Sequence, residues 1–421
     1  MSVAFNSDVT LTVEIAFDSD PFDSSQTWTD VSAYVRGFST NRGRQHDLAD
    51  YQTGTASVTL DNLDDRFNPL NSSSPYWNST TNKTKITPFR QVRIRATHSS
   101  STYSLYRGFI QAYPESFGGQ GVDSSVRIKC VDAFKIFNQN TLGSRGWALG
   151  DASRSKLGES TRLSYVDVQE LSSARITRIL DAFGWNSSER TISTGDLQVK
   201  AGQEQTDNVL SAFKEVEEAE QGQFYMGANG YAVFRDRNYK RTSQYSSQAT
   251  FGNGSGELPF SDVITTQDDS KILNIINVKR AGGTTQGVSD TDSISLYGAR
   301  EDSLTDTLNV SDANTLAIAK QRLAQFSNTS PRIEGLVVNP LSDTDLWVQV
   351  LNRELGDKIT IKVPTTVSTI MEFGVHIDQI NHSVDARNGS WQWQIRTSAG
   401  AESGAWVLGS SRLNEDTNLA W

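Results

Sequence analysis

Apolar and polar residues alternate along much of the first 130 positions, as they do in strands that bury one face. In the first such run Val9, Leu11, Val13 and Ile15 alternate with threonine and glutamate. The intervals are filled by Gly, Asn, Asp, Ser and Pro, which break strands and form turns. The pattern predicts an antiparallel β domain over residues 1–140, with strands at residues 9–17, 31–38, 55–61, 92–97 and 126–130.

The periodicity becomes helical after residue 131. One apolar stripe over residues 174–183 follows Ser172 and ends at Gly184, and a second stripe over residues 209–219 ends near Gly222. Asn229 and Gly230 then stand between two aromatic runs and predict a hairpin with a type I′ turn. Residues 141–240 are therefore predicted to form a compact α+β insertion with helices and a hairpin.

The remaining residues, 241–421, are predicted to form a second β-rich domain with two helices. Residues 241–260 are rich in Ser, Gln and Gly and resemble a linker, and a strand at 272–278 is followed by a loop of Gly, Ser and Asp. Ser311 and Ser342 are predicted to cap the two helices. Period-two alternation returns at residues 357–363, 374–380 and 390–397, and the last run has Trp391, Trp393 and Ile395 on one face.

Composition narrows the classes of function. The 421 residues suggest two or three domains, and 18 Phe, 12 Tyr and 9 Trp exclude a disordered chain. A net charge of −10 argues against general nucleic-acid binding, because phosphate contacts require basic surfaces. The single cysteine, Cys130, excludes an intrachain disulfide and is predicted to be a small buried hydrophobe. We see neither a secretory leader nor a membrane span, and expect synthesis in a host cytoplasm.

Catalytic and cofactor-binding motifs are not found in the sequence. The glycine-rich runs 117–121 and 251–256 open no helix, so neither is expected to bind a phosphate. There is no Gly-x-Ser-x-Gly elbow and no His-Glu-x-x-His helix. Glu215, Glu217, Glu218 and Glu220 are interpreted as a solvated acidic face rather than a glycosidase pair. We predict no catalytic residues and no cofactor.

No metal site is predicted either. Asp18-Ser-Asp20 and Asp290-Thr-Asp292 begin like calcium loops but lack the later Gly and Glu, although adventitious calcium binding stays open. His376 and His382 have no evident third ligand.

Two further patterns have alternative interpretations. Arg93 and Arg95 share one sheet face, which favours a solvated or interface-paired stripe over a phosphate-binding one. Trp391 and Trp393 fit a core strand better than a carbohydrate site.

One block of sequence resembles a known family. Residues 28–44, from Trp28-Thr-Asp-Val to Arg-Gly-Arg44, followed by residues 51–62 and Asp65-Arg-Phe-Asn-Pro69, resemble the opening of minor tail proteins of long-tailed bacteriophages. These are tail-hub proteins that share the fold of contractile-tail baseplate hubs. Residues 212–237 are similar to the insertion of that family, and residues 355–361 and 391–395 are similar to its second barrel.

The resemblance implies two hub-type β-barrel domains with a small helix-hairpin domain. It implies a structural virion protein of the tail tip, in which three copies form a ring that joins the tail tube to the tip and lets DNA pass. Its partners would be further copies of itself and the tail tube, distal tail, tape-measure and tip or receptor-binding proteins. The acidic balance suits a lumen through which DNA slides without binding.

Two alternatives stay open from the sequence. A hexameric distal tail protein carries a related barrel and would account for the same motifs. A tail-tip enzyme that degrades cell wall or glycan would require a convergent catalytic set, which the residues do not indicate. Particle symmetry separates the first alternative from a trimeric hub, and a zymogram on host cell wall tests the second.

Overall fold

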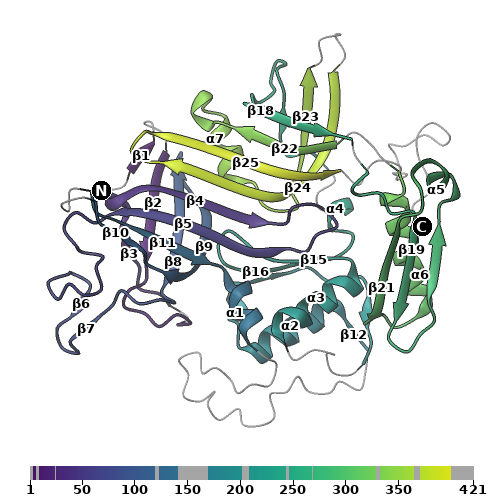
Figure 1. Cartoon of the computed structure of the whole chain (residues 1–421), viewed down its shortest axis with the longest axis horizontal. Helices are drawn as coiled ribbons and strands as arrows, with labels where there is room; N and C mark the ends of the chain where they lie inside the picture. Colours follow the sequence, from purple (N-terminus) through teal and green to yellow (C-terminus); the bar gives the residue numbers. More distant parts are fainter. Residues whose placement is uncertain are drawn as a thin grey trace.

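The computed structural model describes residues 3–5, 9–23, 25–118, 123–140, 169–201, 208–242, 246–267, 269–328, 332–364 and 370–399. Strands dominate this part of the chain, and most of them belong to one long sheet that curls into two neighbouring barrels (Figure 1). Three helices lie beneath the first barrel, and a small sheet with its own helices lies to one side (Figure 1). The predicted fold class, mainly β with an α+β insertion, is confirmed.

The first barrel is antiparallel and closed. β3 (Thr29–Asp30) pairs with β2, and the chain continues through the short 3₁₀ helix η1 (Ser32–Tyr34) into β4, which pairs with β5. One interrupted strand therefore joins the two ends of the sheet. Around the barrel the strands are β2 (Val9–Ile15), β8 (Gln91–His98), β9 (Ser101–Ala112), β11 (Ser125–Val131), β5 (Gln52–Asp61) and β4 (Val35–Gly43).

The apolar side chains that alternate in the sequence form the core of this barrel. Val9, Leu11, Val13 and Ile15 of β2 are all buried, and the apolar positions of β5, β8 and β11 meet them in one core. Cys130 is buried in the same core, where burial raises the pKa of its thiol, so its prediction as an inert hydrophobe is confirmed. β1 (Val3–Phe5) and β10 (Glu115–Ser116) extend the sheet of the barrel. β6 (Trp77–Asn78) and β7 (Lys83–Thr84) pair with each other in a separate two-stranded sheet.

The second barrel is built from the C-terminal strands. Trp393 and Ile395 of its β25 face a core that they share with Ile359, Ile361 and Ile377. Trp391 is also buried, so the core interpretation of the tryptophans is confirmed. The strands, in spatial order, are β17 (Thr250–Phe251), β23 (Lys358–Pro364), β24 (Ile370–Asp385), β25 (Ser390–Ala399), β22 (Arg332–Val338) and β18 (Asp262–Thr266).

The two barrels are joined by direct strand pairing. β4 pairs antiparallel with β24, from Gly43 opposite Gln379 to Gly37 opposite Asp385. We call these two paired segments, residues 37–43 and 379–385, the barrel seam. Because of the seam the backbone hydrogen bonds run without a break from one barrel into the other.

The α+β insertion packs an aromatic core under the first barrel. Phe137 lies at its centre and contacts the rings of Phe134, Phe183, Phe213 and Phe224. Its helices are α1 (Ala133–Gln139), α2 (Ser172–Phe183) and α3 (Val209–Glu220). Its short 3₁₀ helix and strands are η4 (Ser187–Glu189), β12 (Glu170–Leu171), β13 (Arg190–Ile192), β14 (Gln198–Val199), β15 (Gln223–Met226) and β16 (Ala232–Arg235).

A separate three-stranded sheet lies within the region predicted as the second β-rich domain. The order of its strands is β20 (Gln286–Ser289), β19 (Ile275–Arg280) and β21 (Glu301–Thr307), and α6 (Asp312–Phe326) packs on it. The loop predicted to follow β19 contains a helix instead, α5 (Thr291–Tyr297), whose N-cap is Asp290. The predicted domain boundaries at residues 140 and 240 stay a prediction.

Helix starts were predicted with mixed success. Ser311 caps α6 as predicted, by accepting a hydrogen bond from Asn314 N–H. Ser342 caps no α-helix, because it ends the 3₁₀ helix η5 (Pro340–Ser342), and α7 (Leu346–Asn352) begins after Asp345. The remaining helix is α4 (Tyr239–Thr242), and no described helix is long and apolar enough to cross a membrane.

The predicted hairpin exists, but its turn is of another type. Between β15 and β16, Gly230 has a φ of +80°, whereas Asn229 has no positive φ. Gly230 N–H donates to the carbonyl of Gly227, and Gly227 N–H donates to the carbonyl of Tyr231. This is a type I turn followed by a left-handed glycine, so the type I′ assignment is wrong.

Gly230→Val is expected to lower the free energy of unfolding by about 2 kcal/mol, because a β-branched residue is strained at positive φ. The new Cβ would also lie 3.0 Å from Arg107 Cδ. Urea unfolding of the purified chain measures the change. Asn229→Ala is the control, with an expected cost below about 1 kcal/mol. Equal losses for the two variants would restore the type I′ assignment.

Candidate assembly surface

Two of the four carboxylates of α3 are bound within the chain. Glu220 is fully buried, and its carboxylate accepts hydrogen bonds from Ser172 Oγ at 2.7 Å, Asp196 N at 3.0 Å and Leu197 N at 2.9 Å. Glu217 pairs with Lys214 and accepts from Phe224 N. The interpretation of α3 as a solvated acidic face is therefore wrong for these two residues, because each carboxylate ties α3 to a neighbouring segment.

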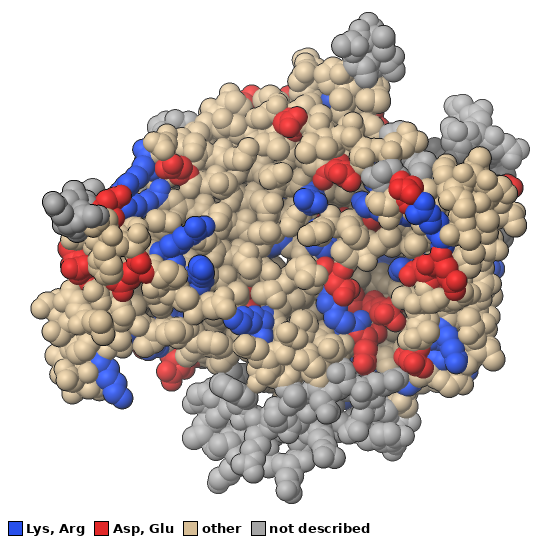
Figure 2. All heavy atoms as spheres, viewed as in Figure 1, with Lys and Arg blue, Asp and Glu red and all other residues tan. Residues whose placement is uncertain are grey.

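α3 also faces a cleft of about 1150 Å³, which Lys214 and Glu217 line together with Glu215 and Glu218. Its walls come from residues 44–53 of the first barrel, from α3, and from β21 and α6 of the small sheet. Figure 2 shows acidic and basic side chains side by side along this hollow. Burial raises the pKa of Glu218, which lines the cleft, to about 7, while Arg322 opposes the shift. Among the described lining residues there is no histidine or cysteine.

Both histidines considered as metal ligands belong to the second barrel. His376 contacts the carbonyl of Gly356 at 3.1 Å, and Trp391 Nε1–H donates to Nδ1 of His382 at 3.3 Å. Burial lowers the pKa of each histidine to about 3, so both rings are neutral at physiological pH. Within the described part of the chain no three His, Cys, Asp or Glu side chains gather into a possible metal site.

Two of the calcium-like aspartates, Asp18 and Asp290, have local partners for their carboxylates. Asp18 pairs with Lys85 at 2.5 Å, and Asp20 N–H donates to Asp23. Asp290 accepts from the backbone N–H groups of Asp292 and Ser293 at the start of α5. These are turn and cap geometries within the chain.

The glycine-rich run 251–256 forms bends and turns. In the run 251–256, Gly254 N–H donates to the Glu257 carboxylate at 2.7 Å, and Lys362 pairs with the same carboxylate. The loop therefore surrounds an acid of its own chain. Most of the run 117–121, from Gly119 onward, lies outside the described residues.

The arginine stripe on β8 is neutralised within the subunit. Glu14 of β2 accepts from both Arg93 and Arg95 at 2.6 Å, and these two arginines lower the pKa of Glu14 against the opposing effect of burial. The guanidinium of Arg93 also lies 4.2 Å from the centre of the Trp28 ring. The arginine stripe is thus a paired sheet face, but its partner is Glu14 of the same chain rather than a residue across an interface.

Charged residues also bridge the barrels beside the barrel seam. Arg44 donates two hydrogen bonds of 3.0 Å to Asp378, whose side chain is fully buried, and Lys240 lies 3.6 Å from the same oxygen. These two cations lower the pKa of Asp378 to about 2 even though burial opposes the shift. On the neighbouring side Arg42 pairs with Glu354 at 2.8 Å.

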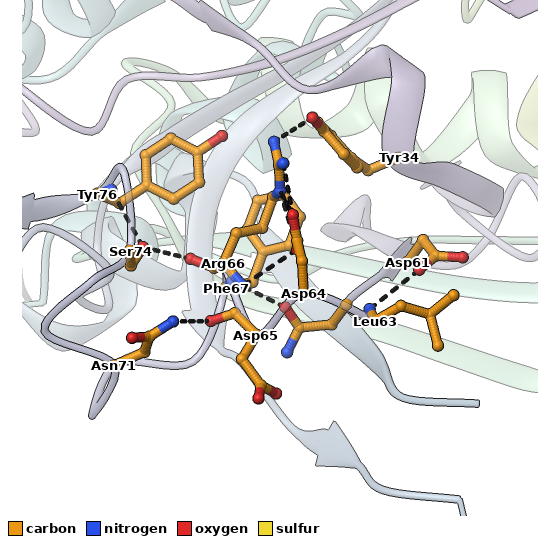
Figure 3. A network of polar contacts seen from close by, with 11 residues as sticks. Tyr34, Asp61, Leu63, Asp64, Asp65, Arg66, Phe67, Asn71, Ser74 and Tyr76 are labelled. Carbon is orange, nitrogen blue, oxygen red and sulfur yellow. Dashed lines mark hydrogen bonds and ion pairs between the residues drawn. The ribbon is translucent and has the colours of Figure 1, made fainter. Parts of the chain in front are cut away.

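Residues 65–69, the last segment of the block that carries the family resemblance, lie in a loop at one end of the first barrel. The earlier segments, 28–44 and 51–62, contain β3, η1, β4 and β5 of the barrel itself. After β5 the chain makes five successive turns, in which residues 65, 68, 71, 74 and 77 each donate a backbone N–H to the carbonyl three residues earlier. Phe67 is fully buried, stacks on Tyr76 at 5.4 Å, and donates its N–H to Asn62 Oδ1 (Figure 3). Arg66 donates hydrogen bonds to the carboxylate of Asp64 and to the hydroxyl of Tyr34 (Figure 3).

This loop is fixed in place but leaves apolar side chains in solvent. Leu63 is 59% exposed and Leu70 is 87% exposed, and in Figure 3 Leu63 extends away from the polar network. Phe117, which follows β10 at the same end of the barrel, is 60% exposed. Fixed loops that expose large apolar side chains are typical of contact sites for other proteins.

The sheet also has strand edges. The path of paired strands ends at β1 on one side and at β18 on the other, and Ile264 of β18 is 47% exposed. An exposed edge presents unpaired backbone groups that another chain can extend. The geometry thus supports protein–protein contacts through the barrel end and the strand edges. Of these surfaces, only the loop after β5 contains residues that stood out in the sequence.

No protein-family model matches the sequence, and no curated protein matches it. Solved structures do. The tail protein from Neisseria meningitidis MC58 matches with a TM-score of 0.54 at 9% identity, over 93% of this chain and 96% of that chain. The 43 kDa tail protein of prophage MuSo2 from Shewanella oneidensis matches with a TM-score of 0.52 at 9% identity, over 93% and 98%. The chain therefore has the fold of these tail proteins.

Proposed function

We propose that this chain is a structural protein of a phage tail tip, in which three copies form a ring-shaped hub. The hub joins the tail tube to the tip and lets DNA pass during ejection. The observation that carries the proposal is the fold match to two tail proteins over nearly the whole length of each chain. The opening block of sequence supports it independently.

The two barrels favour three copies. Each subunit contributes two barrels joined by the barrel seam, so three subunits supply six barrels. Six barrels could continue the sixfold tail tube while the ring itself has threefold symmetry at the tip. A hexameric distal tail protein is the second candidate, and it would present twelve barrels from chains of this architecture.

The partners would be other virion proteins. We place the tail tube, distal tail, tape-measure and tip or receptor-binding proteins next to the ring, and DNA in its lumen without specific binding. The net charge of −10 supports such a lumen, because an acidic wall repels the phosphate backbone. We propose no catalytic role, since the carboxylates, histidines and glycine-rich turns described above serve contacts within the chain.

An image of the assembled particle tests this function. We expect this chain in three copies around a threefold axis at the tail tip. Six copies would support the distal tail alternative, and absence from purified tails would reject a virion role. A zymogram of the purified chain on host cell wall should show no clearing. Clearing that a single carboxylate substitution abolishes would establish the enzyme alternative.

A further inference from the structure

Most carboxylates at the end of the first barrel are paired with arginines. Asp61 and Asp123 both contact Arg36, at 3.1 and 2.7 Å, and Asp64 contacts Arg66. Asp65 and Glu115 differ, because no described cation or donor contacts either carboxylate, and Oε2 of Glu115 is buried without a hydrogen bond. A carboxylate oxygen that is withdrawn from water without a partner is destabilising.

These two unpaired carboxylates repel each other. The strand register brings both residues to the same end of the barrel, because Glu115 pairs with Val126 and Val126 pairs with Leu60, five residues before Asp65. Burial and the charge of Asp65 both raise the pKa of Glu115. The backbone fixes both: Asp65 is held in the left-handed region with a φ of +54°, and Glu115 pairs in register with Val126. The turns and the strand pairing therefore hold the backbone of both residues at this end of the barrel.

Apolar side chains flank this pair. Leu63 lies two residues before Asp65, and Phe117 lies two residues after Glu115. Leu70 is next to Asn71, whose side-chain amide donates to the Asp65 carbonyl at 3.0 Å. We call Leu63, Asp65, Leu70, Glu115 and Phe117 the barrel-end patch. It combines unpaired negative charge with exposed apolar surface on a rigid support.

We propose that the barrel-end patch is a docking site for a protein segment that presents a lysine or arginine between apolar side chains. The cation lies between Asp65 and Glu115, and the apolar side chains cover Leu63, Leu70 and Phe117. Nucleic acid and anionic lipid do not fit, because both carry the same charge as the patch. Only the assignment of the segment to a neighbouring tail protein rests on the proposed function.

Matched peptides test the chemistry with the purified full-length chain. The probes are acetylated, amidated and fluorescent Leu-Arg-Leu-Arg-Leu and Leu-Glu-Leu-Glu-Leu, and binding is followed by fluorescence anisotropy. We expect the arginine peptide to bind at least tenfold more tightly than the glutamate peptide. The double variant Asp65→Asn/Glu115→Gln should remove that difference, and Leu63→Ser/Leu70→Ser should weaken both peptides.

The control is Glu334→Gln/Asp292→Asn, which removes two exposed charges elsewhere and should leave the binding unchanged. Melting temperatures confirm that each variant is folded. Equal binding of the two peptides, or an equal loss in the control, overturns the proposal. In purified tails, the Asp65→Asn/Glu115→Gln variant should be incorporated at least fivefold less than the wild-type chain. If the wild-type chain is itself absent from tails, the proposed function fails and the peptide result alone decides the patch.

Discussion

Gly43→Ala is expected to prevent the two barrels from joining. We expect the free energy of unfolding to fall by about 4 kcal/mol or more, or the variant to yield no soluble protein. Gly43 has a φ of +115°, which side chains of L-residues rarely adopt. An added Cβ would lie 2.1 Å from the Asp378 carbonyl oxygen and 2.8 Å from Gln379 Cα. Both atoms are backbone of β24, so neither can move without opening the barrel seam.

Gly389→Ala separates this clash from ordinary backbone strain. Gly389 also has a positive φ, of +63°, but an added Cβ there meets no atom within 4 Å. Its expected cost is about 1 kcal/mol. Soluble yield and thermal unfolding followed by circular dichroism measure both variants. If Gly43→Ala melts within a few degrees of Gly389→Ala, close packing at the barrel seam does not stabilise the joint.

Asp378→Ala should have the second large effect, a loss of about 3–5 kcal/mol. The substitution removes the fully buried carboxylate that Arg44 contacts twice and that Lys240 approaches. The Arg44 guanidinium would then stay charged and largely buried without the carboxylate that it contacts, which destabilises the folded state. Glu334→Gln, on the exposed face of β22, is the control and should change stability by less than about 0.5 kcal/mol.

The same carboxylate gives this prediction a pH signature. Its pKa is about 2 in the folded chain, below the ordinary value of 3.8, so the folded state holds the ionised form more tightly. The stabilisation is therefore fully present above about pH 4 and is lost as pH falls toward 2. Unfolding measured between pH 2 and 5 should show a steeper acid loss in the wild-type chain than in Asp378→Ala. Parallel curves would mean that Asp378 contributes no proton-linked stability.

Local patterns in the sequence predicted the elements whose stability depends on one buried face. The strands of the first barrel and the helices α2, α3 and α6 follow their apolar periodicity closely. The helix α5 was missed because it is short and buries only Ser293, so it has no apolar stripe to detect. The turn at Gly230 was assigned to the wrong type because a dipeptide does not define the length of the loop around it.

Contacts between segments that are distant in the sequence could not be predicted from local patterns. Arg44 and Asp378 are 334 positions apart, and nothing local to either residue marks them as partners. Glu220 looked solvated because it stands among other glutamates, whereas its hydrogen-bond donors come from residues 172–197 and from Arg237 N–H. The barrel-end patch was foreseeable only at Asp65, which lies in the block that carried the family resemblance. The unpaired state of Asp65 and Glu115 was not, because it depends on which arginines reach the neighbouring acids.

The barrel seam also has a mechanical consequence. Seven residue pairs in register connect β4 to β24, so a torque applied to one barrel passes to the other through backbone hydrogen bonds. Rotating one barrel against the other would require breaking this ladder and the buried contact between Arg44 and Asp378 together. The chain should therefore transmit load as a stiff lever. In the ring proposed above, any opening would then occur between copies of the chain rather than within one.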